Sequence, residues 1–486
     1  MKIAIIGSGL TGSTILESII KHRKFNKDIH ISIFDKRSYF GAGFPHEQDS
    51  IQRVLNVQSH LMSVNDENSF EFSEWLRENN KEESFEKVAP RTYYGEYLHH
   101  HFKNYYEHKN VKFINAEVID VIPNLKNNNI KSYNIKTQKN IYENFDYLFL
   151  AIGHAIYKDI YNFKNKDNFI WNTYPLNEKL SNLKKNNKIG IIGTGASSLD
   201  VFRHLIRRYQ FDSPIYFLSR SSLFDTPDFT YDMVKPKYKF SISDKWILDK
   251  SKSNTFIKLD DILNLIKNDF KENDTNFYEL LEKVKFQNLE DYRKFVDEKD
   301  PKIAILIDYF KKLFPYLAKL YGSLSNLDKL RVINEYDKDI ERFITLIPSK
   351  TFDWFYDEIK NGKVKIIRGL ENIKYKHDKF IVFADKDIQL DILINTTGFN
   401  FNLLENIEFN ELLKNLYDKG LIKPDSNDEF ISVQWPNCNV LSSKYGLIHN
   451  LYIQGMWIGK THYRNNDALS VNKLAKEVSN KFMEKI

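Results

Sequence analysis

Residues 1–12 read MKIAIIGSGLTG, and the rest of the chain is best understood from this stretch outward. Residues 3–6 form an apolar run long enough for a buried parallel strand, and the turn Gly7-Ser8-Gly9-Leu10-Thr11-Gly12 follows without a linker. In such a turn the first glycine permits the tight bend, the second lets a pyrophosphate approach the backbone, and the third lets a helix pack on the strand. We therefore predict a strand, a phosphate-binding turn and a helix whose N-terminus faces the phosphates.

The residues after this helix support the same interpretation. Residues 31–34 read as a second strand that ends on Asp35, at the spacing expected of a carboxylate that binds a ribose hydroxyl. The alternative is an ordinary glycine turn in another kind of α/β protein.

The opening pattern occurs a second time. Residues 188–192 lead into Gly193-Thr194-Gly195-Ala196-Ser197-Ser198, and the following residues are spaced for one apolar helix face. The next predicted strand, residues 215–218, is followed by Arg220 where the first unit has Asp35. An arginine can pair with the 2′-phosphate of NADP, which a carboxylate would repel. This favours NADPH over NADH, and a solvated arginine at a strand end is the alternative.

Each unit also closes on a strand that ends in glycine. Residues 147–151 lead to Gly153, the pattern of a last core strand that turns away beneath a dinucleotide, and residues 391–395 lead to Gly398. A simple strand-to-loop glycine is the alternative for the first of these, at Gly153. A strand at residues 451–454 ends at Gly455, and Asp467 opens the final helix.

Three further regions have a distinct character. Residues 40–53 contain a glycine and proline cluster that we expect to form a loop near the first turn, and residues 55–63 suit a segment lining a cofactor. A helix is expected over residues 68–77 and another from Pro90. Residues 224–345 lack glycine turns and show helical patterns, so we predict a helical insertion over the active-site face.

Composition narrows the class of protein. The 486 residues carry 71 Lys and Arg against 65 Asp and Glu, without a block of like charges, which does not indicate nucleic-acid binding. The single cysteine, Cys438, cannot form a disulfide framework or a C-x-x-C pair, so the disulfide-reductase branch of flavoproteins is excluded. The apolar runs are too short for a membrane span, the histidines form no convincing metal cluster, and we expect a cytoplasmic protein.

The motifs GSGLTG, GAGFPH, LNVQSHLMS, PRTYYGEYL, AIGH and GTGASSLD resemble the bacterial FAD/NAD(P)-binding flavoproteins that include FAD-dependent urate hydroxylase. The resemblance covers residue 1 to about residue 222, and more loosely the later motifs NTTGF and YIQG. More broadly the chain is similar to class B flavin monooxygenases, including the N-hydroxylating enzymes. The F-x-G-x-x-x-H-x-x-x-W fingerprint between the two units is missing, which argues against Baeyer–Villiger and typical flavin-containing monooxygenases.

The resemblance implies roles for individual residues. Asn56 would touch the isoalloxazine and help to hold a flavin hydroperoxide, Met62 would stand in the same segment, and Val118 would contact adenine through its backbone. The helix that begins at Asp467 could face the flavin ring or the ribityl chain. The residues expected to bind FAD or NADPH are Gly7, Gly9, Leu10, Thr11, Gly12, Asp35, Lys36, Asn56, Met62, Ser63, Val118, Gly153, Gly193, Gly195, Ala196, Ser197, Ser198, Arg220, Gly398, Gly455 and Asp467.

The sequence thus predicts an α/β protein with two dinucleotide-binding, Rossmann-like domains and a helical insertion. The FAD-binding domain would comprise residues 1–160 and 401–486, and the NAD(P)H-binding domain residues 185–400, with the insertion at about 224–345. The favoured function is an NADPH-using FAD monooxygenase that hydroxylates a small molecule with molecular oxygen. The alternatives are a flavin reductase or dehydrogenase that does not activate oxygen and a flavin-binding accessory protein without turnover.

Overall fold

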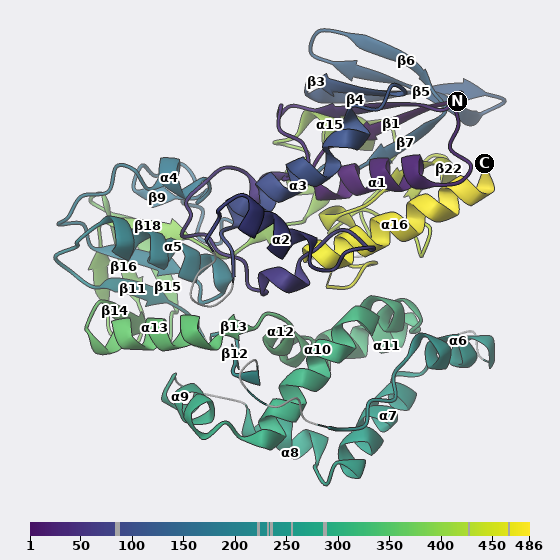
Figure 1. Cartoon of the computed structure of the whole chain (residues 1–486). Coiled ribbons are helices and arrows are strands. Elements are labelled where there is room, and N and C mark those ends of the chain that lie inside the picture. The colour runs from purple at the N-terminus through teal and green to yellow at the C-terminus, as the bar shows by residue number, and fades with distance from the viewer. Residues whose placement is uncertain are drawn as a thin grey trace.

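The computed structural model of this chain describes residues 1–82, 88–220, 224–230, 233, 237–253, 256–284, 289–425, 428–464 and 467–486. Its α/β architecture confirms the predicted fold class (Figure 1). Two separate sheets each contain a parallel strand that leads into its own glycine turn, β1 (Lys2–Ile6) in the first and β10 (Ile189–Ile192) in the second, and a group of helices lies beside both.

The first sheet has seven strands in the order β20-β21-β22-β7-β1-β2-β3. Its strand β1 pairs in parallel with β2 and with β7, which brings the strand ends around the first glycine turn to one edge. The C-terminal strand β22 joins β7 in parallel, so the end of the chain completes the sheet that its beginning started. The strands are β1 (Lys2–Ile6), β2 (His30–Asp35), β3 (Val111–Asn115), β7 (Tyr147–Leu150), β20 (Val433–Gln434), β21 (Asn439–Ser442) and β22 (Gly446–Ile453).

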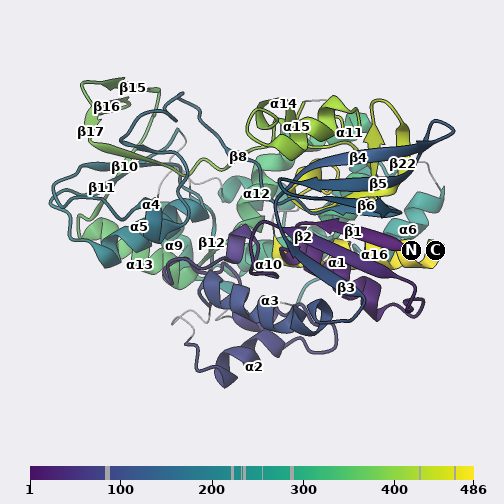
Figure 2. The same ribbon diagram turned by 90° about the horizontal axis from the view of Figure 1, so that it is seen from above.

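The helices around this sheet come from both ends of the chain. Figure 1 shows the first helix, α1, lying along the last one, α16, and a Thr14 to Asn472 hydrogen bond of 2.7 Å joins them. A three-stranded antiparallel meander adjoins the sheet (Figure 2). These elements are α1 (Leu10–Lys21), η1 (Phe44–His46), η2 (Ser59–Leu61), α2 (Glu71–Glu78), α3 (Arg91–Tyr106), β4 (Val118–Lys126), β5 (Asn129–Thr137), β6 (Ile141–Phe145), α14 (Leu403–Asn406), α15 (Glu411–Asp418), η5 (Met456–Ile458) and α16 (Ala468–Lys485).

One predicted helix starts later than expected. The pattern suggested a start at Asn68, but α2 begins at Glu71. The Asn68 side chain accepts a hydrogen bond from the Phe70 N–H, so these residues form a local turn in front of the helix.

The second sheet is parallel throughout, in the order β14-β11-β10-β18-β9. Its edge strand β9 precedes residue 185, so the expected boundary leaves out one strand of this sheet. A strand of two residues has no readable period, which is why the sequence did not indicate it. The elements are β9 (Phe169–Ile170), α4 (Leu176–Lys179), β10 (Ile189–Ile192), α5 (Ala196–Arg208), β11 (Ile215–Leu218), α13 (Ser349–Lys360), β14 (Val364–Ile367), the meander β15 (Asn372–Lys376), β16 (Lys379–Phe383) and β17 (Ile388–Leu390), and β18 (Ile392–Asn395). The short strands β8 (Ile156–Tyr157) and β19 (Phe399–Asn400) pair where the chain passes between the two sheets.

The predicted helical insertion is present between β12 and β13. These two short strands, β12 (Pro227–Asp228) and β13 (Ile347–Pro348), pair in parallel and bring the ends of the insertion together. Its elements are α6 (Asp244–Ser253), α7 (Leu259–Glu272), α8 (Phe277–Lys283), α9 (Leu289–Glu298), α10 (Pro301–Gly322), α11 (Asn326–Arg331), η4 (Val332–Tyr336) and α12 (Asp337–Ile344). We propose that the three units correspond to the three predicted parts of the chain.

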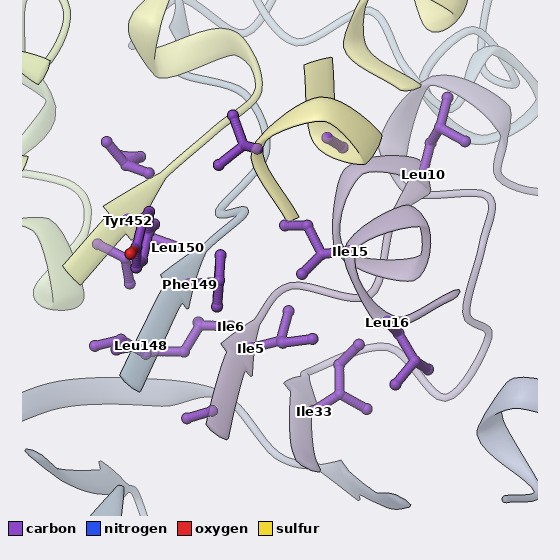
Figure 3. Packing of buried hydrophobic residues seen from close by; sticks show 14 of the residues in the cluster. Ile5, Ile6, Leu10, Ile15, Leu16, Ile33, Leu148, Phe149, Leu150 and Tyr452 are labelled. Carbon is purple, nitrogen blue, oxygen red and sulfur yellow. The ribbon is translucent and has the colours of Figure 1, made fainter. Parts of the chain in front are cut away.

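Packing of the first sheet explains why its glycine turn is held firmly. Ile5 and Ile33 of neighbouring strands and Ile15 and Leu16 of α1 belong to one buried cluster (Figure 3). Burying side chains of this size stabilises the fold by about 1.5–3 kcal/mol each. Among the described residues, none of the helices is both long and apolar enough to cross a membrane.

Candidate functional site

The first glycine turn has the close contacts that its sequence requires. Gly7 has a φ of +102°, and a Cβ there would lie 2.1 Å from the Ala151 carbonyl oxygen. A Cβ on Gly9 would lie 3.2 Å from the Cα of Gly43, and a Cβ on Gly12 would lie 1.8 Å from the Gly7 oxygen. Gly7 and Gly12 are therefore needed because a side chain there would clash with neighbouring backbone atoms. Gly9 and Gly43 lie against each other and form a stretch of backbone surface without side chains.

A cavity of about 250 Å³ opens from this turn. It runs past the loop after β2, the segment at residues 55–62, the end of β7 and the start of α16. The residues that line it are Gly9, Leu10, Thr11, Arg37, Ala42, Gly43, Phe44, Pro45, His46, Leu55, Asn56, Val57, Met62, Arg91, Ala151, Gly153, His154, Gln454, Gly455, Met456, Asp467, Ala468, Leu469 and Val471. The cavity thus joins the first turn to the segment that the sequence suggested for a cofactor.

Polar atoms in this cavity match what a bound dinucleotide needs. Helix α1 begins after Gly9 without a capping side chain among the described residues, so its first N–H groups are available to phosphate. The two polar side-chain atoms of Gln454 and the Nδ1 atoms of His46 and His154 are buried without a hydrogen-bond partner among the described residues. Buried groups of this kind are normally satisfied, which fits a ligand in the cavity. The residues present therefore fit FAD.

Asp35 lies at the end of β2 as expected, but protein donors already engage its carboxylate. Its Oδ2 accepts the Ser8 N–H at 2.8 Å, and its Oδ1 accepts the Arg37 N–H at 2.9 Å. Burial acts to raise the pKa of Asp35, but Arg37 and these N–H groups outweigh it and lower the pKa. Asp35 thus holds the turn and Arg37, and it is Arg37 that lines the cavity.

Asp467 caps the final helix at the far end of the cavity. Its Oδ1 accepts the Ser470 N–H at 2.8 Å, while its Oδ2 has no partner among the described residues. Burial raises the pKa of Asp467 despite the hydrogen bonds from the helix N–H groups. The N-terminus of α16 and one carboxylate oxygen are therefore directed at the ligand space.

Asn56 lies between the large cavity and the start of α5, the helix that follows the second glycine turn. It lines the large cavity, and it also lines a second cavity of about 20 Å³ together with Ala196 of the second turn. The second turn has a shape comparable to the first, since Gly193 has a φ of +117° and α5 begins after Gly195 without a capping side chain among the described residues. Asn56 is therefore the residue that links the large cavity to the side of the second turn at Ala196.

Buried charges connect the two units at this junction. Asp200 of α5 lies 3.9 Å from Arg91 and 3.6 Å from Arg203, and Arg53 stacks at 4.0 Å from the centre of the Tyr174 ring. Burial and the two arginines Arg53 and Arg91 lower the pKa of His46, which faces the large cavity.

His154, on the other side of the cavity, is affected in the same way. Burial, followed by Arg53 and Arg37, lowers the pKa of His154 to about 4. Both histidines are therefore neutral at pH 7, and the positive charge at this end of the cavity comes from the guanidinium groups.

Several expected residues lie away from the large cavity. Lys36 pairs with Glu117 at 3.2 Å, the Ser63 hydroxyl donates to the Asn68 carbonyl at 2.6 Å, and Val118 is a buried strand residue in β4. Gly398 has a positive φ, and a Cβ added there would meet open space, as it would at Gly153.

The remaining residues of the second motif surround its turn. Ser198 is buried and donates to the Gly195 carbonyl at 2.6 Å, Ser197 hydrogen-bonds Tyr174, and Arg220 is exposed two residues after β11 beside Tyr161. The exposure of Arg220 is compatible with binding a 2′-phosphate at the surface, and its role stays a prediction.

Sequence reasoning missed part of the cavity lining. Arg37, Arg91, His154 and Gln454 were not named as site residues, although all four line the cavity. Gln454 directly precedes Gly455, so the YIQG motif contained the signal. Arg91 lies in the motif PRTYYGEYL, so that motif also contained a signal, and the packing of α3 against the loop at residues 40–53 brings its side chain to the cavity. Within the described ranges, no group of three metal-ligating side chains is present.

The first part of the chain matches a known family in sequence. Residues 4–155 match the family model described as FAD-NAD(P)-binding. No curated protein sequence matches the chain.

Solved structures similar to this chain extend over nearly its whole length. The ornithine N-hydroxylase of Kutzneria sp. 744, solved with reduced FAD, NADP⁺ and L-ornithine, has a TM-score of 0.62 at 12% identity and covers 99% of this chain and 98% of its own. The FAD-bound cadaverine monooxygenase from Erwinia amylovora has a TM-score of 0.61 at 13% identity, with 100% and 94% covered. The bacillithiol disulfide reductase from Staphylococcus aureus has a TM-score of 0.52 at 11% identity, with 100% and 98% covered. At these identities the likeness concerns the fold.

Proposed function

We propose that this chain is an FAD-dependent, NADPH-using monooxygenase that hydroxylates a small molecule. The observation that carries the proposal is the position of Asn56, which lines both the cavity of the first glycine turn and the cavity of the second. A dinucleotide on each turn would have its reactive end near this residue. That arrangement is what transfer of a hydride from one cofactor to the other requires.

The chain's own residues would bind and orient the first cofactor. The N-terminus of α1 and the bare surface of Gly9 and Gly43 would receive the pyrophosphate, with Arg37 supplying positive charge. Gln454 offers a buried donor and a buried acceptor. The flavin, when bound, supplies the redox chemistry and the reaction with oxygen.

Other residues would control the reactive end of the site. Arg91 brings a guanidinium to a part of the cavity where His46 and His154 are neutral, so its charge favours a ligand that becomes negative. Met62 and Leu55 are buried and exclude water beside Asn56. Arg220 would select NADPH over NADH by pairing with the 2′-phosphate.

Primary amines are the first substrates to test. The structural neighbours include enzymes named for ornithine, cadaverine and lysine, and the shared fold makes such amines suitable candidates. Purines belong in the same screen because of the resemblance to FAD-dependent urate hydroxylase, which stays a prediction. The cytoplasmic location also stays a prediction from the sequence.

A disulfide reductase fits the chain less well, although one neighbour with this fold has that name. The single cysteine, Cys438, is fully buried, and burial raises the pKa of its thiol to about 12. Attack on a disulfide needs a thiolate, which this thiol does not supply at pH 7.

The test is anaerobic reduction followed by oxygen. NADPH should bleach the flavin of the purified protein, and oxygen with an accepted amine should then yield the hydroxylated product, detected by mass spectrometry. Bleaching that leads only to hydrogen peroxide, across amines, amino acids and purines, would support the reductase instead. If NADPH does not bleach the flavin, both enzyme functions are contradicted. The function that then remains is that of a flavin-binding accessory protein without turnover.

A further inference from the structure

The carboxyl group of Asp225 lies over the second glycine turn. A Cβ placed on Gly195 would be 3.9 Å from the Asp225 Oδ2 atom. This oxygen is shielded from solvent and has no hydrogen-bond donor among the described residues. An acidic side chain in this position is unexpected, because a turn of this kind followed by a helix N-terminus normally receives phosphate.

Charged groups of both signs lie near Asp225, since Arg203 lines the same cavity and Arg342 of α12 bonds the neighbouring Tyr292. It lines the cavity of about 20 Å³ with Asn56, and α5 contributes Asp200 and Arg203 to the same cavity. Arg203 faces Asp200 at 3.6 Å and donates to the Thr351 hydroxyl of α13 at 3.3 Å.

The insertion adds further groups that oppose ionisation. Glu341 of α12 repels the Asp225 carboxylate, and Tyr292 of α9 interacts with it electrostatically. Burial first, and then Glu341, raise the pKa of Asp225 to about 7. The group therefore changes its charge close to neutral pH.

We propose that Asp225 must be a neutral carboxylic acid when a nicotinamide dinucleotide occupies the second glycine turn, so that binding takes up one proton. This inference rests on the proposed assignment of that turn to NADPH. The diphosphate brings negative charge to the N-terminus of α5, where an Asp225 carboxylate would repel it. The neutral acid removes this repulsion and can donate its O–H to an oxygen of the ligand. The proton comes from solvent on binding and returns on release.

Linkage gives the consequence for affinity. If the complex contains the neutral acid, the apparent affinity for the nucleotide falls as pH rises above the titration of Asp225. The limiting slope is about tenfold in Kd for each pH unit, because one proton is involved. At lower pH the free protein is already neutral at this position, and the slope disappears.

The experiment measures NADP⁺ binding to the FAD-loaded protein between pH 7.5 and 9. In this range the 2′-phosphate, whose second pKa is about 6, keeps one charge state. Titration calorimetry in buffers of different ionisation enthalpy counts the protons taken up by the unaltered protein. We expect uptake that approaches one proton per NADP⁺ as pH rises and a Kd that increases about tenfold per unit at the upper end.

Asp225→Asn should abolish both effects and bind NADP⁺ across the whole range at least as tightly as the unaltered protein does at pH 7.5. Asp212→Asn is the matched control, since Asp212 is an exposed carboxylate in the same unit, 3.1 Å from Lys185, and it should keep the pH dependence. If the unaltered protein takes up no proton, or if Kd of the Asp225→Asn protein keeps the same dependence on pH, the role of Asp225 is overturned. The assignment of the turn to NADPH would survive either result. Failure of NADP⁺ to bind any of the proteins would overturn the assignment of the turn itself.

Discussion

At the scale of single residues, Asn56 and Arg220 test different halves of the proposed reaction. Asn56 lies between the two cavities, whereas Arg220 is exposed beyond β11. Substitutions at these two positions should therefore have different effects. A change at Asn56 would alter the reaction of the flavin, whereas a change at Arg220 would alter the choice between NADPH and NADH.

Asn56→Ala should lower the amount of hydroxylated product formed per NADPH oxidised, while the rate of anaerobic flavin reduction changes little. The reason is that the amide is expected to support the oxygen reaction and not to hold NADPH. Product and hydrogen peroxide are measured together during turnover. His60→Ala, at an exposed position in the same segment, serves as the control. Equal product yield in both variants would contradict the role of Asn56.

Arg220→Ala should raise the KM for NADPH by about 10- to 100-fold, as expected for loss of a charge-assisted hydrogen bond worth about 1.5–3 kcal/mol. The KM for NADH should change little, because NADH lacks the 2′-phosphate. Steady-state flavin reduction with both cofactors is the measurement, and Lys185→Ala, an exposed cation of the same unit, is the control. Equal losses with the two cofactors would rule out the 2′-phosphate contact.

At the scale of elements, a buried histidine joins three helices of the first unit. His101 of α3 lies 3.3 Å from Glu17 of α1 and 2.8 Å from Glu71 of α2. Burial opposes the charge, but the two carboxylates outweigh it and raise the pKa of His101 from 6.5 to about 9. The contacts that hold α2 and α3 against α1 are thus sensitive to pH.

The sign follows from linkage. The contribution of His101 to stability is fully present below pH 6.5 and is lost as pH rises through about 9. His101→Gln should lower the free energy of unfolding by about 1–3 kcal/mol near pH 6.5 and should flatten the decline toward pH 9. Denaturant unfolding at several pH values checks this, with His100→Gln, at an exposed position of the same helix, as the control. An unchanged decline in His101→Gln would show that another group causes it.

At the scale of the whole molecule, buried charge joins the first unit to the second. Arg203 donates to the Gln52 carbonyl at 3.3 Å, and His204 shares a 2.8 Å hydrogen bond with Ser50. Both contacts run from α5 to the loop at residues 40–53, which lines the large cavity. The relative position of the two nucleotide turns therefore depends on this junction.

Arg203→Met should lower the free energy of unfolding by about 2 kcal/mol or more, because it removes one of the cations beside the buried Asp200. It should also slow flavin reduction by NADPH by loosening the junction. Thermal unfolding and anaerobic reduction are measured on the same protein, and Arg207→Met, near the end of the same helix, is the control. A stable variant with normal reduction would contradict this role of the junction.

Much of the architecture could be predicted because it depends on patterns of residues that are close together in the sequence. The turns at Gly7 and Gly193, the strands before them and the helices after them follow from glycine spacing and apolar runs. The segment at residues 55–62 was also expected near a cofactor. The side chain of Arg37 was not, because its place in the cavity depends on packing between elements far apart in the chain.

The sequence by itself determined the fold class, the two glycine turns and the position of the helical insertion, since spacing between neighbouring residues encodes these features. Only the tertiary structure decided that Asn56 lines both cavities, that Arg37 and not Asp35 lines the first, and that Asp225 lies over Gly195. Each of these depends on contacts between residues distant along the chain. Such contacts are set by how sheets and helices pack, and no local pattern carries them.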